Sequence, residues 1–271
     1  MKKHLVLISM LISAAPVFSG EPGKPELSGD KKYEVKKVNN NAFTYGEQLS
    51  YHIHYGVLSG GMAYFEVDDK PQTVNNRNVY YIKVHGKSAG MVDVLFKVRD
   101  EYESYLDADA LLPWKSTKKV KEGGYTDSDF IIYDHQNGVA TSRRGKINIE
   151  DQTRDIISAI YYARSTDMTN ARPGDEFPVN FYLDGKNYQL RFKFIKREDI
   201  STEVGTFRTL VVKPQLIEGR VFKDSEALTL WVSDDENKVP LRAESSLFVG
   251  SIRADLVDFK NLKNPLSSKI K

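Results

Sequence analysis

The sequence lacks cysteine altogether, which excludes disulfide bonds, thiol catalysis, iron–sulfur clusters and zinc sites built from thiolates. It also lacks an excess of either charge: 39 Lys and Arg residues stand against 37 Asp and Glu residues. The formal net charge of +2 is that of Lys2 and Lys3, which lie in a segment that we expect to be removed. A neutral chain is a poor partner for nucleic acid, because that binding depends on phosphate neutralisation. The motifs GxxxxGK[ST] and GxGxxG are absent too, and we predict no cofactor.

Long apolar runs are also missing, except near residue 1. Lys2, Lys3 and His4 precede the apolar stretch 5–18, which ends in a small-residue site that suits cleavage before Gly20. The stretch is shorter than the roughly 20 residues that cross a bilayer. We therefore predict a cleaved signal peptide over residues 1–19 and a soluble periplasmic protein without a membrane span in the mature chain.

The remaining sequence divides into three parts. Residues 20–41 are polar and broken by Pro22 and Pro25, which indicates a flexible leader. Residues 42–260 contain no linker and no clear repeat, and this length is normal for a single all-β domain, here a β-barrel-like one. Residues 261–271 form a polar tail. The balance of 40% hydrophobic and 28% charged residues indicates a globular protein.

Apolar and polar side chains alternate along several segments, as in strands with one buried and one solvated face. The alternation is strict over 188–194 and recurs over 228–232 and 252–256. Asp184-Gly185 stands between two such runs and predicts a hairpin. The acidic residues of segment 100–103 are interpreted as the charged outer face of another strand. Because the strands have polar outer faces, we expect roughly ten to twelve of them in an antiparallel sheet.

Residues 153–164 have helical rather than strand periodicity. Asp151 or Thr153 can cap the helix, and Arg164 suits its C-terminal end. Residues 91–98 are ambiguous and compatible with a short second helix. The predicted fold class is mostly β: a curved antiparallel sheet, half-barrel or barrel, wrapped around one main α-helix. The apolar stripe of that helix consists of Ile156, Ile157, Ile160, Tyr161 and Ala163.

Residues 86–90 match the GxSxG motif of serine hydrolases, with Ser88 as the serine. In those enzymes the serine stands between a strand and a helix of a parallel sheet, and an acid and a histidine follow. His135 is the only histidine after Ser88, and the chain does not alternate strands with helices. We interpret the segment as a loop of small residues and predict a non-enzymatic protein without catalytic residues. A serine hydrolase that uses Ser88 is a remote alternative.

Two groups of residues resemble parts of metal sites. His52 and His54 share one face of a strand, so a site there needs a third ligand, such as His85 or a carboxylate. Residues 234–237 concentrate oxygen ligands that suit calcium but lack the spacing of a calcium loop. Surface histidines and a polar hairpin loop explain the same residues, and we predict no metal site.

The apolar strand faces and the single helix favour a binding protein. A sheet that curls around a helix can hold a long apolar guest, and burying one CH₂ group is worth about 0.8 kcal/mol. We predict a periplasmic protein that binds a lipid or acyl chain in its lumen. If the side chains instead fill a solid core, the alternative is an envelope module that binds another protein. The predicted lumen residues are Ile157, Tyr161, Tyr188, Leu190, Phe192, Phe194, Leu228 and Leu230.

Several segments together carry a family resemblance: 43–51 with Gly56 and Gly60, 99–105, 155–164, 230–235 with Pro240, and 250–252. In this order they are similar to one bacterial family, the domain of unknown function family 3108. The family is exported and has no established activity. The resemblance therefore implies a periplasmic location and a β-rich fold, and it assigns no catalytic residue.

A weaker similarity lies in the last third of the sequence. A strand that ends near Trp231, a polar turn and residues 239–242 resemble the lipoprotein carriers of the periplasm. Those carriers are curved half-barrels that hold acyl chains against helices. The resemblance implies a half-barrel here as well.

Overall fold

The computed structural model describes residues 34–56, 58–216, 228–246 and 251–271. These residues form one antiparallel sheet of fifteen strands and two helices, α2 (Gly90–Leu95) and α3 (Ile156–Arg164). The mostly β, antiparallel prediction is confirmed. The strands are β1 (Gln48–Tyr55), β2 (Leu58–Val67), β3 (Gln72–Val74), β4 (Arg77–Ser88), β5 (Arg99–Asp107), β6 (Pro113–Glu122), β7 (Tyr125–Asp134), β8 (Val139–Ser142), β9 (Gly145–Asn148), β10 (Glu176–Leu183), β11 (Lys186–Thr202), β12 (Gly205–Leu216), β13 (Leu228–Ser233), β14 (Pro240–Ser246) and β15 (Ser251–Lys260).

The expected number of ten to twelve strands is too low. Strands β3, β8 and β9 contain only three or four residues each. Segments this short hold too few side chains for a period of two to be distinguished from a turn.

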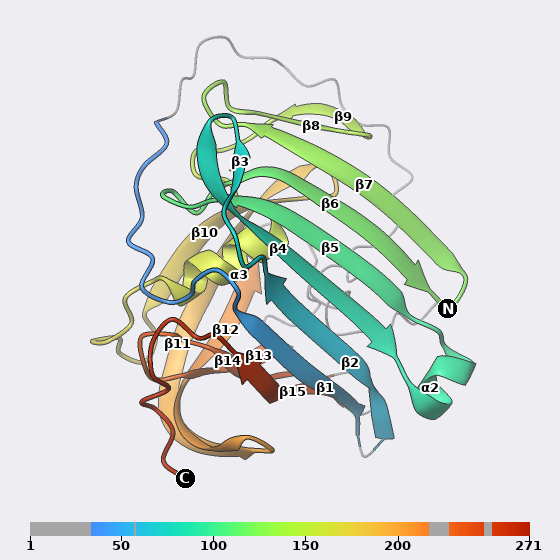
Figure 1. Cartoon of the computed structure of the whole chain (residues 1–271), viewed down its shortest axis with the longest axis vertical. Coiled ribbons are helices and arrows are strands. Elements are labelled where there is room, and N and C mark those ends of the chain that lie inside the picture. Colours follow the sequence, from blue (N-terminus) through green and yellow to red (C-terminus); the bar gives the residue numbers. More distant parts are fainter. Residues whose placement is uncertain (1–33, 57, 217–227, 247–250) are drawn as a thin grey trace.

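The order of strands in the sheet is β10-β11-β12-β13-β14-β15-β1-β2-β4-β5-β6-β7-β8-β9, and β3 pairs only with β4. Nearly every neighbouring pair is therefore local in sequence. The exception is β1 with β15, which pair antiparallel in the middle of the sheet. Strands β9 and β10 follow each other along the chain, yet they form the two edges (Figure 1). The sheet is open, and α3 lies in the segment between its edges.

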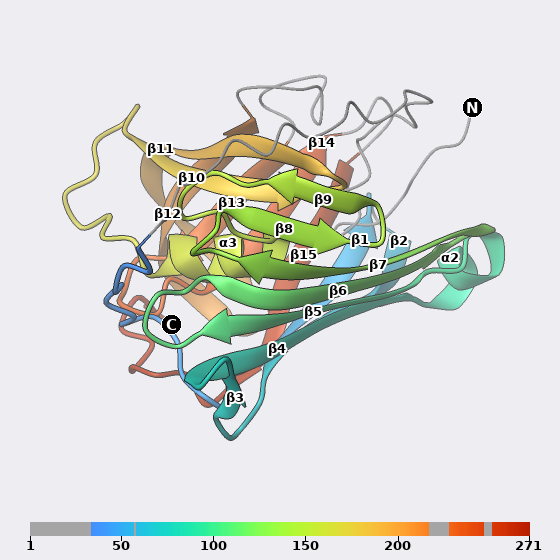
Figure 2. The same cartoon turned by 90° about the horizontal axis from the view of Figure 1, so that it is seen from above.

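The sheet curls until these two edges approach each other (Figure 2). The main-chain N–H of Arg154 donates to the carbonyl of Asn180 at 2.9 Å. The side-chain amide of Asn187 donates to the carbonyl of Asn148 at 2.7 Å. We call this contact between residues 148–154 and the β10–β11 hairpin the seam. It joins the edges by a few separate hydrogen bonds in place of a strand ladder.

Helix α3 lies within the curve of the sheet and contacts β5 and β10 (Figure 1). It starts at Ile156, three residues later than predicted, and neither Asp151 nor Thr153 caps it. The cap is Asp155, whose Oδ1 accepts from the N–H of Ser158 at 2.7 Å, while the Ser158 hydroxyl accepts from the N–H of Asp155 at 2.8 Å. The helix begins late because Arg154 forms a bridge with Phe181 across the seam, which leaves Asp155 as the cap.

The predicted hairpin at Asp184-Gly185 is present. Both residues have positive φ, 47° and 84°, as a two-residue hairpin turn requires. The following strand, β11, alternates as expected, with Leu190, Phe192 and Phe194 all buried. A bulge after Phe194 then shifts the register against β12.

The interior of the described barrel is filled mainly by side chains of the sheet. One apolar cluster extends from β1, β2, β4 and β5 through α3 to β14 and β15. Smaller clusters lie under β7 and β8 and under β10–β13. The largest fully buried side chains are aromatic: Phe43, Tyr133, Tyr161, Phe194 and Phe207.

The described residues outside the sheet are docked on it. Val38 donates its N–H to the carbonyl of Asp109, and Ile270 donates its N–H to the carbonyl of Thr206, both at 2.7 Å. Residues 34–41 of the predicted leader and the predicted tail thus contact the barrel. The predicted signal peptide lies outside the described residues. Neither α2 nor α3 has the length or apolar character to cross a bilayer, and the described chain has no further helix.

Candidate functional site

The eight residues predicted to line a lumen are divided among several apolar clusters, where most of them are buried by neighbouring side chains. Their role in binding remains a prediction. The main cluster holds Ile157, Tyr161 and Tyr188, a second holds Leu190, Phe192 and Leu230, a third holds Phe194, and Leu228 is buried at the start of β13.

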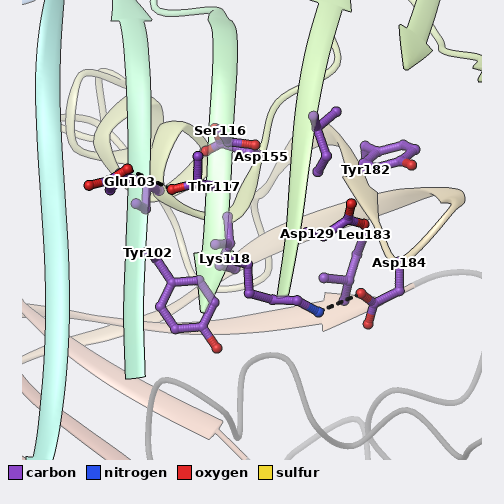
Figure 3. Close-up of a pocket in the computed structure, with 13 residues that line it drawn as sticks. Tyr102, Glu103, Ser116, Thr117, Lys118, Asp129, Asp155, Tyr182, Leu183 and Asp184 are labelled. Atoms are coloured by element: carbon purple, nitrogen blue, oxygen red, sulfur yellow. Dashed lines mark hydrogen bonds and ion pairs between the residues drawn. The ribbon is translucent and has the colours of Figure 1, made fainter. Parts of the chain in front are cut away.

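A small cavity lies between the start of α3 and strands β5, β6 and β7 (Figure 3). Its volume is about 40 Å³, which is room for roughly two or three water molecules. Sites for ligands of drug size need about 300–1,000 Å³. Its lining is partly polar: in Figure 3, Lys118 points toward Asp184, and Asp155 lies beside Ser116. This space does not accommodate an acyl chain.

A wider hollow of about 370 Å³ lies at the β3–β4 turn. Asn76, Asn78 and Asp109 make its lining polar. Its cation, Arg77, is already paired with the buried carboxylate of Asp107 and lies 3.6 Å from that of Asp109. These groups suit water or a polar ligand better than an apolar chain.

Strand β5 carries a buried acid on its inner face, contrary to the prediction for segment 100–103. Asp100 is 2% exposed, and burial together with the nearby Glu122 carboxylate raises its pKa to about 8. Glu101 and Glu103 do face outward, and Glu101 pairs with Lys83 at 2.7 Å. The prediction was wrong for Asp100 because neighbouring residues of a strand point to opposite faces.

Ser88 belongs to a structural network at the end of β4. Its hydroxyl donates to Asp93 at 2.5 Å and accepts from the N–H of Val98 at 2.8 Å. The imidazole of His135 is bonded to the carbonyl of Pro113 at 2.7 Å. Strand β7 starts near α2 and ends beside His135, so the two residues lie at opposite ends of the barrel. Ser88 and His135 are therefore too far apart to act as the serine and histidine of a hydrolase.

The acidic loop 234–237 is tied into the fold through Asp235. One carboxylate oxygen accepts from the hydroxyl of Ser233 at 2.8 Å and from the N–H of Asn237 at 3.1 Å. The other oxygen accepts from the hydroxyl of Ser268 at 2.7 Å. These contacts agree with the interpretation as a polar hairpin loop.

Helix α2 presents apolar side chains to solvent at one end of the barrel. Met91, Val94 and Leu95 are 73%, 86% and 79% exposed, and Leu58 of the β1–β2 hairpin is 52% exposed. We call these four residues the apolar tip. The helix projects from the end of the sheet (Figures 1 and 2) and buries none of its residues. Contiguous exposed apolar side chains of this kind mark interaction sites.

A compact ion pair holds the apolar tip in place. Arg99 Nη1 lies 2.6 Å from Asp93 Oδ1, and the hydroxyl of Ser88 donates to the same oxygen. Hydrogen bonds from Arg99 and then from Ser88 lower the pKa of Asp93 to about 2. The one acid of α2 is therefore neutralised by its own partner.

Two glycines allow the strands to approach under the tip. A Cβ at Gly61 would lie 2.2 Å from the carbonyl oxygen of Lys87, where β2 meets β4. Gly123 has φ +57°, and a Cβ there would lie 2.4 Å from the Phe96 ring. Phe96 thus packs on the bare backbone of the β6–β7 turn, and a Cβ at Gly123 would force its ring to move, while a Cβ at Gly61 would overlap main-chain atoms.

Exposed lysines lie on the elements that meet at the apolar tip. Lys87 and Lys121 are the next-to-last residues of β4 and β6, and Lys97 follows α2. Their elements meet there, because the N–H of Gly123 donates to the carbonyl of Lys97 at 2.9 Å. The sequence interpretation missed this site. Its signal is the apolar run 91–96, which contains one acid, contains no turn residue and has lysines on both sides.

Comparison with known proteins gives a family and a fold. A family model described as "Protein of unknown function (DUF3108)" matches residues 50–257. No curated protein matches the chain. A β-barrel-like protein of the DUF1849 domain from Brucella abortus is 7% identical with a TM-score of 0.52, over 81% of this chain and 99% of that chain. This likeness shows a shared β-barrel-like fold alone.

Two other solved structures are less similar. One is a Bacteroides fragilis protein with a YmcC-like fold, assigned as exported, at 13% identity and a TM-score of 0.33 over 81% of this chain and 97% of that chain. The other is a Parabacteroides distasonis protein assigned as a lipoprotein, at 17% identity and a TM-score of 0.32 over 83% of this chain and all of that chain. Neither likeness carries an argument about function.

Proposed function

We propose that this chain, which belongs to the DUF3108 family of proteins of unknown function, is an exported, non-enzymatic protein that binds lipid through its apolar tip. Its ligand is the surface of an anionic membrane of the cell envelope. The observation that supports this function is the unburied helix α2 with lysines on both sides. The predicted signal peptide over residues 1–19 supports a periplasmic location.

The apolar tip supplies part of the binding free energy. Burying one side chain of the size of Met, Val or Leu is worth about 1.5–3 kcal/mol. Met91, Val94 and Leu95 lie within little more than one helical turn, so one shallow insertion covers all three. Partial burial at a lipid headgroup boundary recovers only a fraction of that value, so the tip alone binds weakly.

The lysines supply the second part. Each lysine near an anionic membrane surface contributes about 1 kcal/mol. Lys87, Lys97 and Lys121 therefore add a contribution similar to that of the apolar side chains. The acid of α2 does not oppose it, since Asp93 is paired with Arg99. Stable but reversible membrane association usually requires two such contributions, here apolar insertion and electrostatic attraction.

The small volume of the interior cavity favours a binding site on the surface over one in the lumen. The cavity beside α3 is about 40 Å³ and is lined in part by charged groups. A packed interior is also compatible with a second candidate function, an envelope module that binds another protein. The same apolar tip is the docking surface for that candidate, so the two differ only in the partner.

Flotation with lipid vesicles tests the proposal. The full mature chain is mixed with vesicles of phosphatidylethanolamine and phosphatidylglycerol, and separately with neutral phosphatidylcholine vesicles. We expect binding to the anionic vesicles that weakens with salt. Val94→Ser/Leu95→Ser removes most of this binding, and Lys87→Gln/Lys97→Gln reduces it on anionic vesicles only.

The matched control is Ile132→Ser on β7. Ile132 is 51% exposed, like the tip residues, but lies on the outer wall of the sheet. This variant should float like the parent protein. If the parent protein ignores anionic vesicles, or if the tip and control variants behave alike, lipid is not the partner of the tip.

A further inference from the structure

Three potential metal ligands from two distant segments converge beside β1. His52 and His54 lie on one face of β1, opposite the buried Tyr51 and Ile53. Glu203 lies in the turn of the long β11–β12 hairpin, about 150 residues later in sequence. One ligand atom from each of the three side chains lies within 4.8 Å of the other two. The pairing of histidines was visible in the sequence, but the third ligand depends on how the hairpin curls (Figure 1).

The imidazole of His52 is already oriented for coordination. Its Nε2 lies 2.7 Å from the hydroxyl of Ser59, and its Nδ1 lies 3.8 Å from Oε1 of Glu203. When Nε2–H donates to Ser59, the lone pair of Nδ1 faces the carboxylate. Metal-binding histidines commonly fix their second nitrogen through such a hydrogen bond.

The second imidazole lies beside the first. The ring centroids of His52 and His54 are 4.1 Å apart, with 50° between the ring planes. One nitrogen of each ring therefore lies in the same small space beside the carboxylate of Glu203.

The charges around the three ligands are balanced. Arg253 lies opposite His54 on β15, but its Nε is 2.9 Å from a carboxylate oxygen of Asp255. Arg242 pairs with the other oxygen of that carboxylate. Glu203 is the one carboxylate of the ligand set, and its side chain is 64% exposed. The arrangement suits a divalent cation.

We propose that His52, His54 and Glu203 bind one Zn²⁺ ion, with solvent in the fourth position. Two imidazoles and one carboxylate are a donor set that zinc accepts, and three protein ligands leave one position open. Bond lengths of about 2.0–2.2 Å require the ligands to draw together, which rotation of Glu203 permits. The bound ion links the β11–β12 hairpin to β1 and thereby stabilises the folded state.

Zinc titration of the full chain, purified without a histidine tag and treated with chelator, tests this site. We expect one Zn²⁺ per chain by calorimetry, a higher melting temperature with zinc, and a tetrahedral absorption spectrum with Co²⁺. His54→Ala and Glu203→Gln should each weaken zinc binding by about tenfold or more, and Ser59→Ala by about tenfold.

The matched control uses another histidine–carboxylate pair of the described sheet. His85 Nδ1 lies 3.7 Å from Glu66 Oε2, without the second histidine of the proposed site. His85→Ala should leave zinc affinity and stoichiometry unchanged. The proposal is overturned if the parent chain binds no stoichiometric zinc, or if His54→Ala and Glu203→Gln bind zinc as the parent does. It is also overturned if the loss follows His85→Ala instead.

Discussion

The ion pair of Arg164 and Glu47 connects three segments at the centre of the molecule. Both side chains are almost fully buried, and the guanidinium contacts the carboxylate at 2.6 and 2.8 Å. Arg164 also donates to the carbonyls of Asn237 and Ala42. The pair thus fixes the end of α3 against the entry to β1 and the β13–β14 turn.

Glu47→Gln should destabilise the protein strongly. The substitution keeps the size of the side chain but leaves the Arg164 charge buried without a counter-charge, which costs about 3–5 kcal/mol. Urea unfolding measures this free energy. The double variant Glu47→Leu/Arg164→Met removes both charges and should recover most of the loss. Glu176→Gln, which breaks a half-exposed pair with Arg191, should cost less than about 1 kcal/mol.

Asp100 predicts a decline of stability with rising pH. An unfolded aspartate loses its proton near pH 4, whereas burial raises the pKa of folded Asp100 to about 8. Between these values the folded state binds one proton more than the unfolded state. The free energy of unfolding therefore falls as pH rises, by up to about 1.4 kcal/mol per pH unit.

Asp100→Asn should flatten this decline. Urea unfolding at pH 5, 6.5 and 8 measures the slope for the parent and the variant. The control is Asp69→Asn, which removes an exposed carboxyl and should keep the parental slope. An unchanged slope in Asp100→Asn would show that another group causes the pH dependence.

At the residue scale, the sequence shows which side chains are present but not which ones meet. Arg164 was correctly placed at the end of a helix, but its partner lies 117 residues earlier. Glu203 approaches His52 from an even greater distance in sequence. Such pairs depend on tertiary packing, on which local periodicity gives no information.

At the scale of elements, hydrophobic alternation predicted the longer strands well. The strands at 188–194, 228–232 and 252–256 and the turn at Asp184-Gly185 are all present. The start of α3 was predicted too early, because apolar periodicity does not show that the seam holds Arg154 in an extended conformation. The pattern also could not show that α2, an apolar segment, stays unburied.

Gly123→Ala should loosen the apolar tip. An alanine at φ +57° costs about 1–2 kcal/mol, and its Cβ would overlap the Phe96 ring. We expect lower stability and faster hydrogen exchange over residues 90–98. Gly124→Ala is the control, because a Cβ at Gly124 meets nothing within 4 Å. Equal exchange in the two variants would mean that Phe96 does not support the tip.

At the scale of the molecule, the curved antiparallel sheet could be predicted, while the size of the space inside it could not. The residues predicted to bind lipid inside pack in several clusters, and their role in binding stays a prediction. The alternation of apolar and polar residues shows which side chains face the interior, but it does not show how much space remains between them. That depends on how the aromatic side chains of opposite walls fit together.

The seam should be the least stable part of the wall. The Asn180 side chain donates to the carbonyl of Asp151 at 2.8 Å, and few hydrogen bonds besides this one connect the two edges. Asn180→Leu should speed hydrogen exchange over residues 148–155 more than elsewhere. Asn170→Leu, in an exposed loop, serves as the control. Uniform exchange rates in both variants would contradict a weak seam.

The pairing of β1 with β15 has a consequence for how the polypeptide could be divided. Strands β1–β9 form one unbroken meander, and β10–β15 form another. A cut in the exposed loop after α3, near residue 170, would leave each meander whole. The two fragments would reassociate by rebuilding the β1–β15 ladder together with the seam and the packing of α3 on β10, so their complementation should report on these contacts jointly.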